Sequence, residues 1–158
     1  MELLQTTLCY LEQNGCYLML HRIKKKKDVN HDKWIGVGGK FESGETALDC
    51  ALREVREETG LTMQAPQYRG IVDFYCPPCP AERMHLYTCT EFTGTMTDCD
   101  EGTLEWVPKD AVQDLPIWPG DKIFFRLLAE DAPFFHLELT YDGDTLMRAM
   151  LDGREMPL

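Results

Sequence analysis

Residues 39–61 of this 158-residue chain read GKFESGETALDCALREVREETGL. Apolar side chains recur at positions 48, 51, 52 and 55, which is the spacing of one face of a helix. Thr46 is a favourable N-cap residue and Gly60 a favourable stop, so the pattern predicts a helix over residues 46–59. The glycines that precede it predict a tight loop leading into this helix.

Three glutamates gather on one side of the predicted helix. Glu54, Glu57 and Glu58 stand at i, i+3 and i+4, so they share an arc of roughly 100°. Like charges at these spacings repel by about 0.2–0.5 kcal/mol per pair, and a divalent cation would turn the repulsion into ligation. Oxygen ligands favour hard cations such as Mg²⁺, which also binds substrate phosphates. On the helix alone, a solvated acidic face paired to Arg53 or Arg56 is the alternative.

The glycine-rich loop lies just ahead of these acids. Gly38 and Gly39 let the backbone approach a ligand closely. The loop is not a Walker phosphate loop, because Trp34 stands where that motif needs glycine and Phe41 where it needs Ser or Thr.

Read as a whole, the stretch has a fixed order of residues and gaps. A glycine is followed after five residues by Glu45, after seven more by Arg-Glu-Val at 53–55, and then by Glu-Glu at 57–58 and Gly-Leu at 60–61. This matches the Nudix box at residues 39–61, and the chain resembles a Nudix hydrolase.

The resemblance implies an α/β (α+β) fold, an αβα sandwich with a central mixed β-sheet, and residues 1–158 fit a single Nudix domain. The box would form a loop, helix and loop that bind Mg²⁺, with Mn²⁺ as a substitute. Family members hydrolyse a nucleoside diphosphate linked to another group, with metal neutralising the pyrophosphate charge while water attacks phosphorus.

The box also implies roles for individual residues. Glu54 and Glu58 resemble the main metal ligands, assisted by Glu57 and the backbone carbonyl of Gly39. Arg53 and Glu45 resemble supports, because an arginine can hold carboxylates bidentately and fix their rotamers. The general base is expected to be Glu54 or Glu101.

Outside the box, three segments resemble the MutT-type nucleoside triphosphate pyrophosphatases that clear oxidised purine nucleotides. Residues 34–45 resemble their glycine-rich stretch, in which Lys40 would contact phosphate, and Arg22 resembles another phosphate contact. Residues 99–101 resemble their acidic loop and make Glu101 a further metal ligand or the base.

The third segment, residues 118–121, resembles the part that reads the base. The indole of Trp118 would stack on the purine and the carboxyl group of Asp121 would hold it. Two positions depart from the pattern. Ile35 stands where the oxidised-purine enzymes tend to carry a base-reading Asn, and Gly120 replaces an acid.

The function implied is Mg²⁺-dependent hydrolysis of a nucleoside triphosphate to the monophosphate and pyrophosphate, favouring oxidised purines such as 8-oxo-dGTP. One alternative is a Nudix hydrolase of ADP-ribose, a dinucleoside polyphosphate or another nucleoside diphosphate derivative. The other is a catalytically silent Nudix-fold ligand-binding module, against which the retained, mutually repelling Glu54, Glu57 and Glu58 argue.

The composition of the chain restricts the classes of molecule that it could bind. The formal net charge of −11 repels polyanions, so we expect a small nucleotide substrate and no nucleic-acid polymer. No apolar run approaches the roughly 20 residues needed to span a bilayer, which argues against a membrane partner. Seven scattered cysteines do not form a disulfide framework, and a cytoplasmic monomer or homodimer is expected. Cys76 and Cys79 are expected to be reduced thiols, with a labile disulfide as the alternative.

The remaining pattern predicts further elements. Trp34 and Trp106 are expected in the core. The lysine run at 24–27 either steers a triphosphate or belongs to a solvated loop. The predicted elements are a hairpin of residues 3–12 and 16–23, strands at 68–75, 84–92 and 104–107, a helix at 119–130 with proline in its first turn, and a closing hairpin of 135–141 and 145–151.

Overall fold

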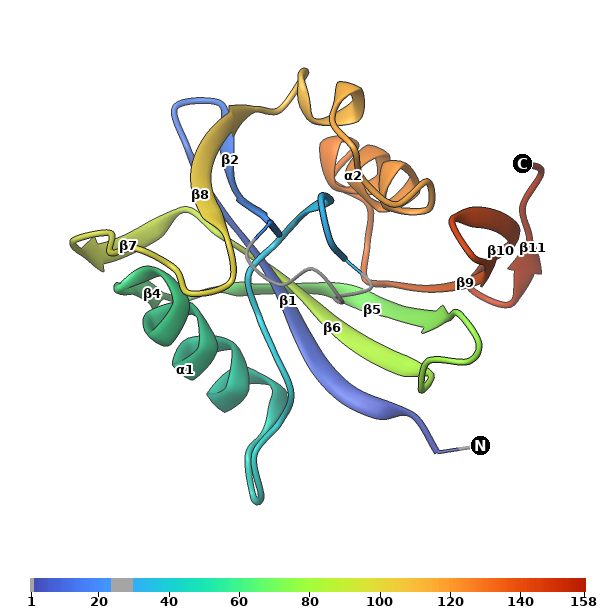
Figure 1. Cartoon of the computed structure of the whole chain (residues 1–158), viewed down its shortest axis with the longest axis horizontal. Coiled ribbons are helices and arrows are strands. Elements are labelled where there is room, and N and C mark those ends of the chain that lie inside the picture. The colour runs from blue at the N-terminus through green and yellow to red at the C-terminus, as the bar shows by residue number, and fades with distance from the viewer. Residues whose placement is uncertain (1, 24–29) are drawn as a thin grey trace.

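The computed structural model describes residues 2–23 and 30–158. Within these residues a mixed β-sheet is flanked by two helices, α1 (Ala47–Thr59) and α2 (Asp121–Ala129), which lie on opposite sides of it (Figure 1). The predicted mixed sheet between helical layers is confirmed. The lysine run at 24–27 lies outside the described residues.

The main sheet has the order β11-β10-β9-β5-β6-β1-β2-β3, and β8 also pairs with β2. The pairs β1/β6 and β5/β9 are parallel and the other pairs are antiparallel, which makes the sheet mixed. Its strands are β1 (Leu4–Gln13), β2 (Cys16–His21), β3 (Trp34–Ile35), β5 (Gln67–Tyr75), β6 (Glu82–Cys89), β8 (Thr103–Pro108), β9 (Phe135–Asp142), β10 (Thr145–Leu151) and β11 (Arg154–Glu155). A separate ribbon pairs β4 (Leu61–Gln64) with β7 (Glu91–Gly94), and a short 3-10 helix, η1 (Val112–Asp114), precedes α2.

The helix at the centre of the sequence motif begins and ends where its caps predict. The Thr46 hydroxyl accepts a hydrogen bond from the Asp49 amide, and the Asp49 side chain accepts one from the Thr46 amide, both at 3.1 Å. At the other end, Gly60 has a φ of 80°, the left-handed conformation of a helix C-cap. Both predicted hairpins, β1/β2 and β9/β10, are also confirmed.

Three details differ from the sequence prediction. The short strands β3, β4 and β11 were not expected, because two to four residues carry too little periodicity. The strand predicted at 84–92 is divided, since β6 stays in the main sheet while β7 leaves to pair with β4. Helix α2 begins at Asp121 with Gly120 as its N-cap, so Pro119 precedes the helix instead of opening it.

Alternation along β1 sends successive side chains to two separate cores. Tyr10 packs with α2 residues such as Phe124, whereas Cys9 and Leu11 pack with α1 residues such as Val55. Trp34 and Trp106 are half-buried against these two cores, as expected. All seven cysteines are free thiols. Neither helix in the described part of the chain is long and apolar enough to cross a membrane.

Candidate functional site

The glycine-rich loop is fastened to the edge of β1. Val37 exchanges two backbone hydrogen bonds with Cys9, at 2.6 and 3.0 Å. Gly38 has a φ of 156°, and a Cβ there would lie 2.0 Å from the Thr7 carbonyl oxygen, so only glycine fits at this position. The loop is therefore held in one path between β1 and helix α1.

Two glutamates of α1, one turn apart, face this loop. The Gly38 amide donates a hydrogen bond to Glu58 Oε2 at 3.0 Å. A Cβ on Gly39 would lie 2.6 to 2.7 Å from the carboxylate atoms of Glu54, so glycine is needed to admit this side chain. The Gly39 carbonyl, a predicted metal ligand, accepts hydrogen bonds from the Thr7 amide at 2.9 Å and Cys50 Sγ at 3.4 Å. A metal bound there would share the oxygen with these donors.

Arg53 organises the acids at the other edge of the helix. Its Nε and Nη2 donate to the two oxygens of Glu45 at 2.7 and 2.9 Å, and its Nη1 donates to Glu54 at 2.8 Å and Glu57 at 3.0 Å. Hydrogen bonds from Arg53 lower the pKa of Glu45 to about 2. One guanidinium therefore fixes the carboxylates of three glutamates. This is the geometry expected of an arginine that orients metal-binding carboxylates without binding the metal itself.

A second group of charges forms around Glu58. Glu101, in the turn before β8, accepts a hydrogen bond from Arg22 Nη1 at 3.0 Å. Burial, and next the negative charge of Glu101, raise the pKa of Glu58 to about 8, although the Gly38 amide works in the opposite direction. Arg22, predicted to contact phosphate, therefore pairs here with a predicted metal ligand. Burial and the nearby carboxylate thus disfavour the charged form of Glu58.

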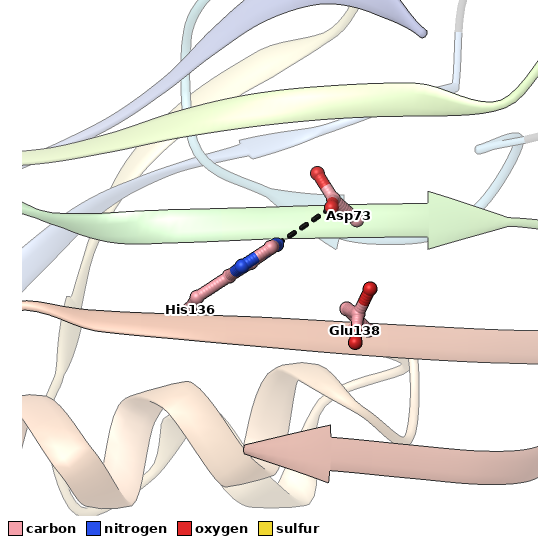
Figure 2. Close-up of side chains that lie close together, drawn as sticks. All are labelled: Asp73, His136 and Glu138. Carbon is pink, nitrogen blue, oxygen red and sulfur yellow. Dashed lines mark hydrogen bonds and ion pairs between the residues drawn. The ribbon is translucent and has the colours of Figure 1, made fainter. Parts of the chain in front are cut away.

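The donor set fits a hard divalent cation, since it consists of carboxylate oxygens and a backbone carbonyl. The raised pKa of Glu58 points the same way, because a cation would stabilise the charged form that burial disfavours. Among the described residues, however, no three of these glutamates bring carboxylate oxygens to within 4.8 Å of one another. The group that does so is Asp73, His136 and Glu138 (Figure 2).

This second group lies on the neighbouring strands β5 and β9. Asp73 is fully buried, and its two oxygens accept hydrogen bonds from Arg83 Nε at 2.8 Å and Nη2 at 2.9 Å. His136 Nε2 lies 2.6 Å from Asp73 Oδ2, the contact drawn in Figure 2. Burial would raise the pKa of Asp73, but the hydrogen bonds from Arg83 and His136 outweigh it and lower the pKa. The Asp73 charge is thus already compensated.

The residues predicted to read the base lie on the α2 side. The Trp118 side chain is only 3% exposed, and its ring meets Phe74 and Tyr141 edge-on, each at 4.9 Å between centroids. Its Nε1 donates to Asn30 Oδ1 at 2.7 Å. Burial raises the pKa of Asp121 to about 8, while the positive charge of Lys33 acts to lower it. Trp118 is therefore a core residue in this structure, and its role in binding stays a prediction.

A backbone hydrogen bond connects the segment before α2 to the strand that leads into the glycine loop. The amide of Trp34, in β3, donates to the Pro116 carbonyl at 2.8 Å, which ties the segment before α2 to the strand that leads into the glycine loop. The side chain of Lys40 is exposed, and its carbonyl accepts a hydrogen bond from Arg53 Nη2 at 3.1 Å. Its predicted phosphate contact remains a prediction.

Three residues near these groups were not singled out from the sequence. Glu42 lies 3.3 Å from Arg53 Nη1, Cys50 contacts the Gly39 carbonyl, and Lys33 Nζ lies 4.4 Å from the centroid of the Trp118 ring. Glu42 and Cys50 lie within the motif itself, so their proximity could have been expected. Lys33 and Trp118 are far apart in the sequence, and nothing in the spacing brings them together.

Comparisons with known proteins cover most of the chain. A family model described as NUDIX domain matches residues 4–128. An uncharacterized Nudix hydrolase, YvcI of Bacillus subtilis, is 29% identical over 142 residues, covering 87% of this chain and 86% of the relative. An oxidized purine nucleoside triphosphate hydrolase of Mus musculus is 31% identical over 124 residues, covering 78% and 80%. The crystal structure of a MutT protein from Bacillus halodurans superposes with a TM-score of 0.82 at 30% identity, covering 95% and 98%.

Proposed function

The chain belongs to the Nudix family as a MutT-type hydrolase, and from that premise we propose that it hydrolyses a nucleoside triphosphate to the monophosphate and pyrophosphate, favouring oxidised purines such as 8-oxo-dGTP. It is an enzyme that acts on phosphoric anhydrides of small nucleotides, and Nudix hydrolases generally use divalent metal ions. We propose that the ion here is Mg²⁺, with Mn²⁺ as a substitute.

The arrangement around the glycine loop carries this proposal. The loop is fixed to β1, Arg53 orders the carboxylates on one side of it, and the charged form of Glu58 is disfavoured on the other by burial and by Glu101. A triphosphate bound with a divalent cation would supply that charge and would bring phosphate oxygens to the exposed end of the loop.

The proposed metal-binding groups are those named from the motif: Glu54, Glu57, Glu58, Glu101 and the Gly39 carbonyl. When bound, the ion would neutralise charge on the triphosphate and lower the pKa of the attacking water. Arg53 holds Glu54 and Glu57 in one orientation, and the Gly38 amide holds Glu58. Arg22 and Lys40 would balance the phosphate charge. Glu54 or Glu101 would accept the proton that the attacking water loses.

The proposed preference for oxidised purines is supported by the names of two relatives. The Mus musculus relative is named an oxidized purine nucleoside triphosphate hydrolase. A second relative, 32% identical over 97 residues that make up 30% of its length, is named an 8-oxo-(d)GTP phosphatase of Mycolicibacterium smegmatis. Trp118 and Asp121 would hold the base, as the sequence predicts.

Turnover of a nucleotide panel tests the proposal. The panel contains 8-oxo-dGTP, dGTP, 2-oxo-dATP, dCTP, ADP-ribose and diadenosine polyphosphates, each with Mg²⁺ and with EDTA, and the products are resolved by chromatography. We expect 8-oxo-dGTP to be the best substrate and to release pyrophosphate only with metal. Preference for ADP-ribose or a dinucleotide would contradict the triphosphate assignment. No turnover of any compound would favour a silent ligand-binding module.

A further inference from the structure

The Cys50 thiol contacts the backbone of the glycine loop. Cys50 lies in α1 and is fully buried. Its Sγ lies 3.4 Å from the Gly39 carbonyl oxygen, 3.5 Å from Thr7 Oγ1 and 3.9 Å from Arg53 Nη2. Thr7, in β1, is also buried, and its hydroxyl accepts a hydrogen bond from the Gly39 amide at 3.4 Å. Side chains from β1 and α1 therefore bind both polar groups of the Gly39 backbone, its N–H and its C=O.

The hydrogens available fix the direction of these bonds. The Gly39 amide and the Arg53 guanidinium can only donate, so the Thr7 hydroxyl, among the described residues, has the Cys50 sulfur as its acceptor. The sulfur carries one hydrogen of its own, and the Gly39 carbonyl is the acceptor that remains for it. The bonds thus form a closed ring, from the Gly39 amide through Thr7 and Cys50 to the Gly39 carbonyl.

The Gly39 carbonyl oxygen accepts two hydrogen bonds of unequal strength. One comes from the Thr7 amide at 2.9 Å and belongs to the backbone contacts that fasten the loop to β1. The other comes from Cys50, and a thiol is a weak donor. Because a carbonyl oxygen has two lone pairs, an ion bound to this oxygen would take the place of one of the two donors. The thiol is the donor that can be displaced at the lower cost.

We infer that Cys50 is a positioning residue for the Gly39 carbonyl, which it holds through a weak hydrogen bond and releases when an ion binds. The inference rests on the proposed function and deepens it, because it takes this carbonyl as a metal ligand and adds a residue that the Nudix box leaves unspecified. A serine hydroxyl at position 50 would be a stronger donor and would compete with the ion, whereas an alanine would leave the lone pair open.

Calorimetric titration of the whole chain with Mn²⁺, without nucleotide, tests the inference through these two substitutions. Cys50→Ser should weaken Mn²⁺ binding by about 3- to 10-fold, the effect of one hydrogen bond. Cys50→Ala should bind Mn²⁺ as tightly as the unmodified chain or more tightly. Cys89→Ser is the matched control, because the buried Cys89 also donates to backbone carbonyls, those of Gln64 at 3.4 Å and Glu91 at 3.0 Å. This control should leave Mn²⁺ binding unchanged.

The order of the two affinities separates this role from a structural one. If the thiol only filled space or stiffened the loop, Cys50→Ser would be the closer mimic and Cys50→Ala would bind Mn²⁺ more weakly. Weaker Mn²⁺ binding in Cys50→Ala, or unchanged binding in Cys50→Ser, would therefore overturn the inference.

Infrared absorption of the S–H group tests the same claim in the unmodified chain. The S–H stretching band of Cys50 is identified as the band that Cys50→Ser removes. It should move to higher frequency when Mn²⁺ is added, because the hydrogen bond to the Gly39 carbonyl is released. The band that Cys89→Ser removes should stay where it is. A Cys50 band that does not move at saturating Mn²⁺ would overturn the inference.

The infrared result also distinguishes the inference from the proposed function. If the chain hydrolyses 8-oxo-dGTP and the Cys50 band does not move, the proposed function stands and the inference is overturned. If the Cys50 band moves with Mn²⁺ and the chain hydrolyses no triphosphate, the proposed function fails and the inference stands. If the chain binds no Mn²⁺, with or without nucleotide, the inference is overturned whatever the chain hydrolyses.

Discussion

Two clusters of acidic side chains in the described part of the chain differ in how tightly they are packed, and the tighter one is the poorer candidate for a catalytic metal. Asp73, His136 and Glu138 bring their ligand atoms to within 4.8 Å of one another, whereas no three of the proposed ligands on and near α1 do so in the described residues. Asp73, however, already accepts both donors of Arg83.

The pKa shifts of the two clusters run in opposite directions. Hydrogen bonds from Arg83 and His136 overcome burial and lower the pKa of Asp73, whereas burial and the charge of Glu101 raise the pKa of Glu58. The charge of Asp73 is therefore already compensated by its donors, whereas the charged form of Glu58 would gain from a cation supplied from outside. This disfavoured charge at Glu58, more than the closeness of donors, distinguishes the proposed metal site.

The largest expected effect comes from Glu58→Gln, which removes a charge from the proposed metal site with little change in shape. Turnover should fall by more than about 100-fold, because such ligands contribute several kcal/mol to catalysis. Glu138→Gln makes the same change in the other cluster and should leave turnover intact. Steady-state rates at saturating Mg²⁺ measure both, with circular dichroism to confirm folding. Turnover of Glu58→Gln within about threefold of the unmodified chain would show that the metal role is wrong.

The next effect is that of Arg53→Lys. A lysine cannot hold Glu45 bidentately and reach Glu54 and Glu57 at the same time, so the proposed ligands lose their fixed orientation. We expect turnover to fall about 10- to 100-fold and the Mg²⁺ requirement to rise. Arg56→Lys, on the exposed side of the same helix, is the matched control. Equal rates for the two variants would refute the supporting role of Arg53.

The Arg83→Met variant tests the cluster of Asp73, His136 and Glu138. It leaves a buried Asp73 carboxylate with fewer donors, which should lower the free energy of unfolding by about 2–3 kcal/mol, since unpaired buried charges are costly. Arg148→Met breaks an exposed pair with Glu155 and should cost less than about 1 kcal/mol. Urea unfolding measures both, and turnover at a permissive temperature should be preserved. A loss of Mg²⁺ dependence in Arg83→Met would mean that this cluster takes part in catalysis.

The smallest expected effect is a pH dependence of stability at Asp73. The pKa of Asp73 in the folded chain lies below its ordinary value of 3.8, so its ionised form stabilises the fold above about pH 4, and this contribution is lost as the pH falls through the folded pKa. Asp73→Asn should therefore be clearly destabilised at pH 7 and less so at pH 3.5. Urea unfolding at the two pH values gives the difference. A gap that widens at low pH would contradict the sign of the shift.

Local features of the proposed metal site on helix α1 could be predicted from the sequence. Thr46 and Gly60 cap α1 as their residue types suggest, and the spacing of Glu45 and Arg53 places them in contact. These interactions occur within one short stretch, residues 45–60, in which the caps fix the ends of the helix and only the local path of the chain has to bring Glu45 to Arg53. The motif therefore carried most of the information about this part of the site.

Contacts between distant segments could not be predicted in the same way. Asp73 contacts Arg83 and His136 only because β5 lies between β6 and β9. That strand order cannot be inferred from the sequence of any one segment. Lys33 reaches Trp118 for a similar reason, since β3 is hydrogen-bonded to the segment before α2. Sheet register and tertiary packing, not local periodicity, bring these side chains together.

Calorimetric titration with Mn²⁺ and Mg²⁺ tests the central claim most directly. The unmodified chain, Glu58→Gln and Glu138→Gln are compared under one set of conditions, without nucleotide and with a non-hydrolysable triphosphate analogue. We predict that Glu58→Gln greatly weakens metal binding and that Glu138→Gln leaves it unchanged. Metal binding that survives in Glu58→Gln and is lost in Glu138→Gln would place the ion in the other cluster and contradict the account.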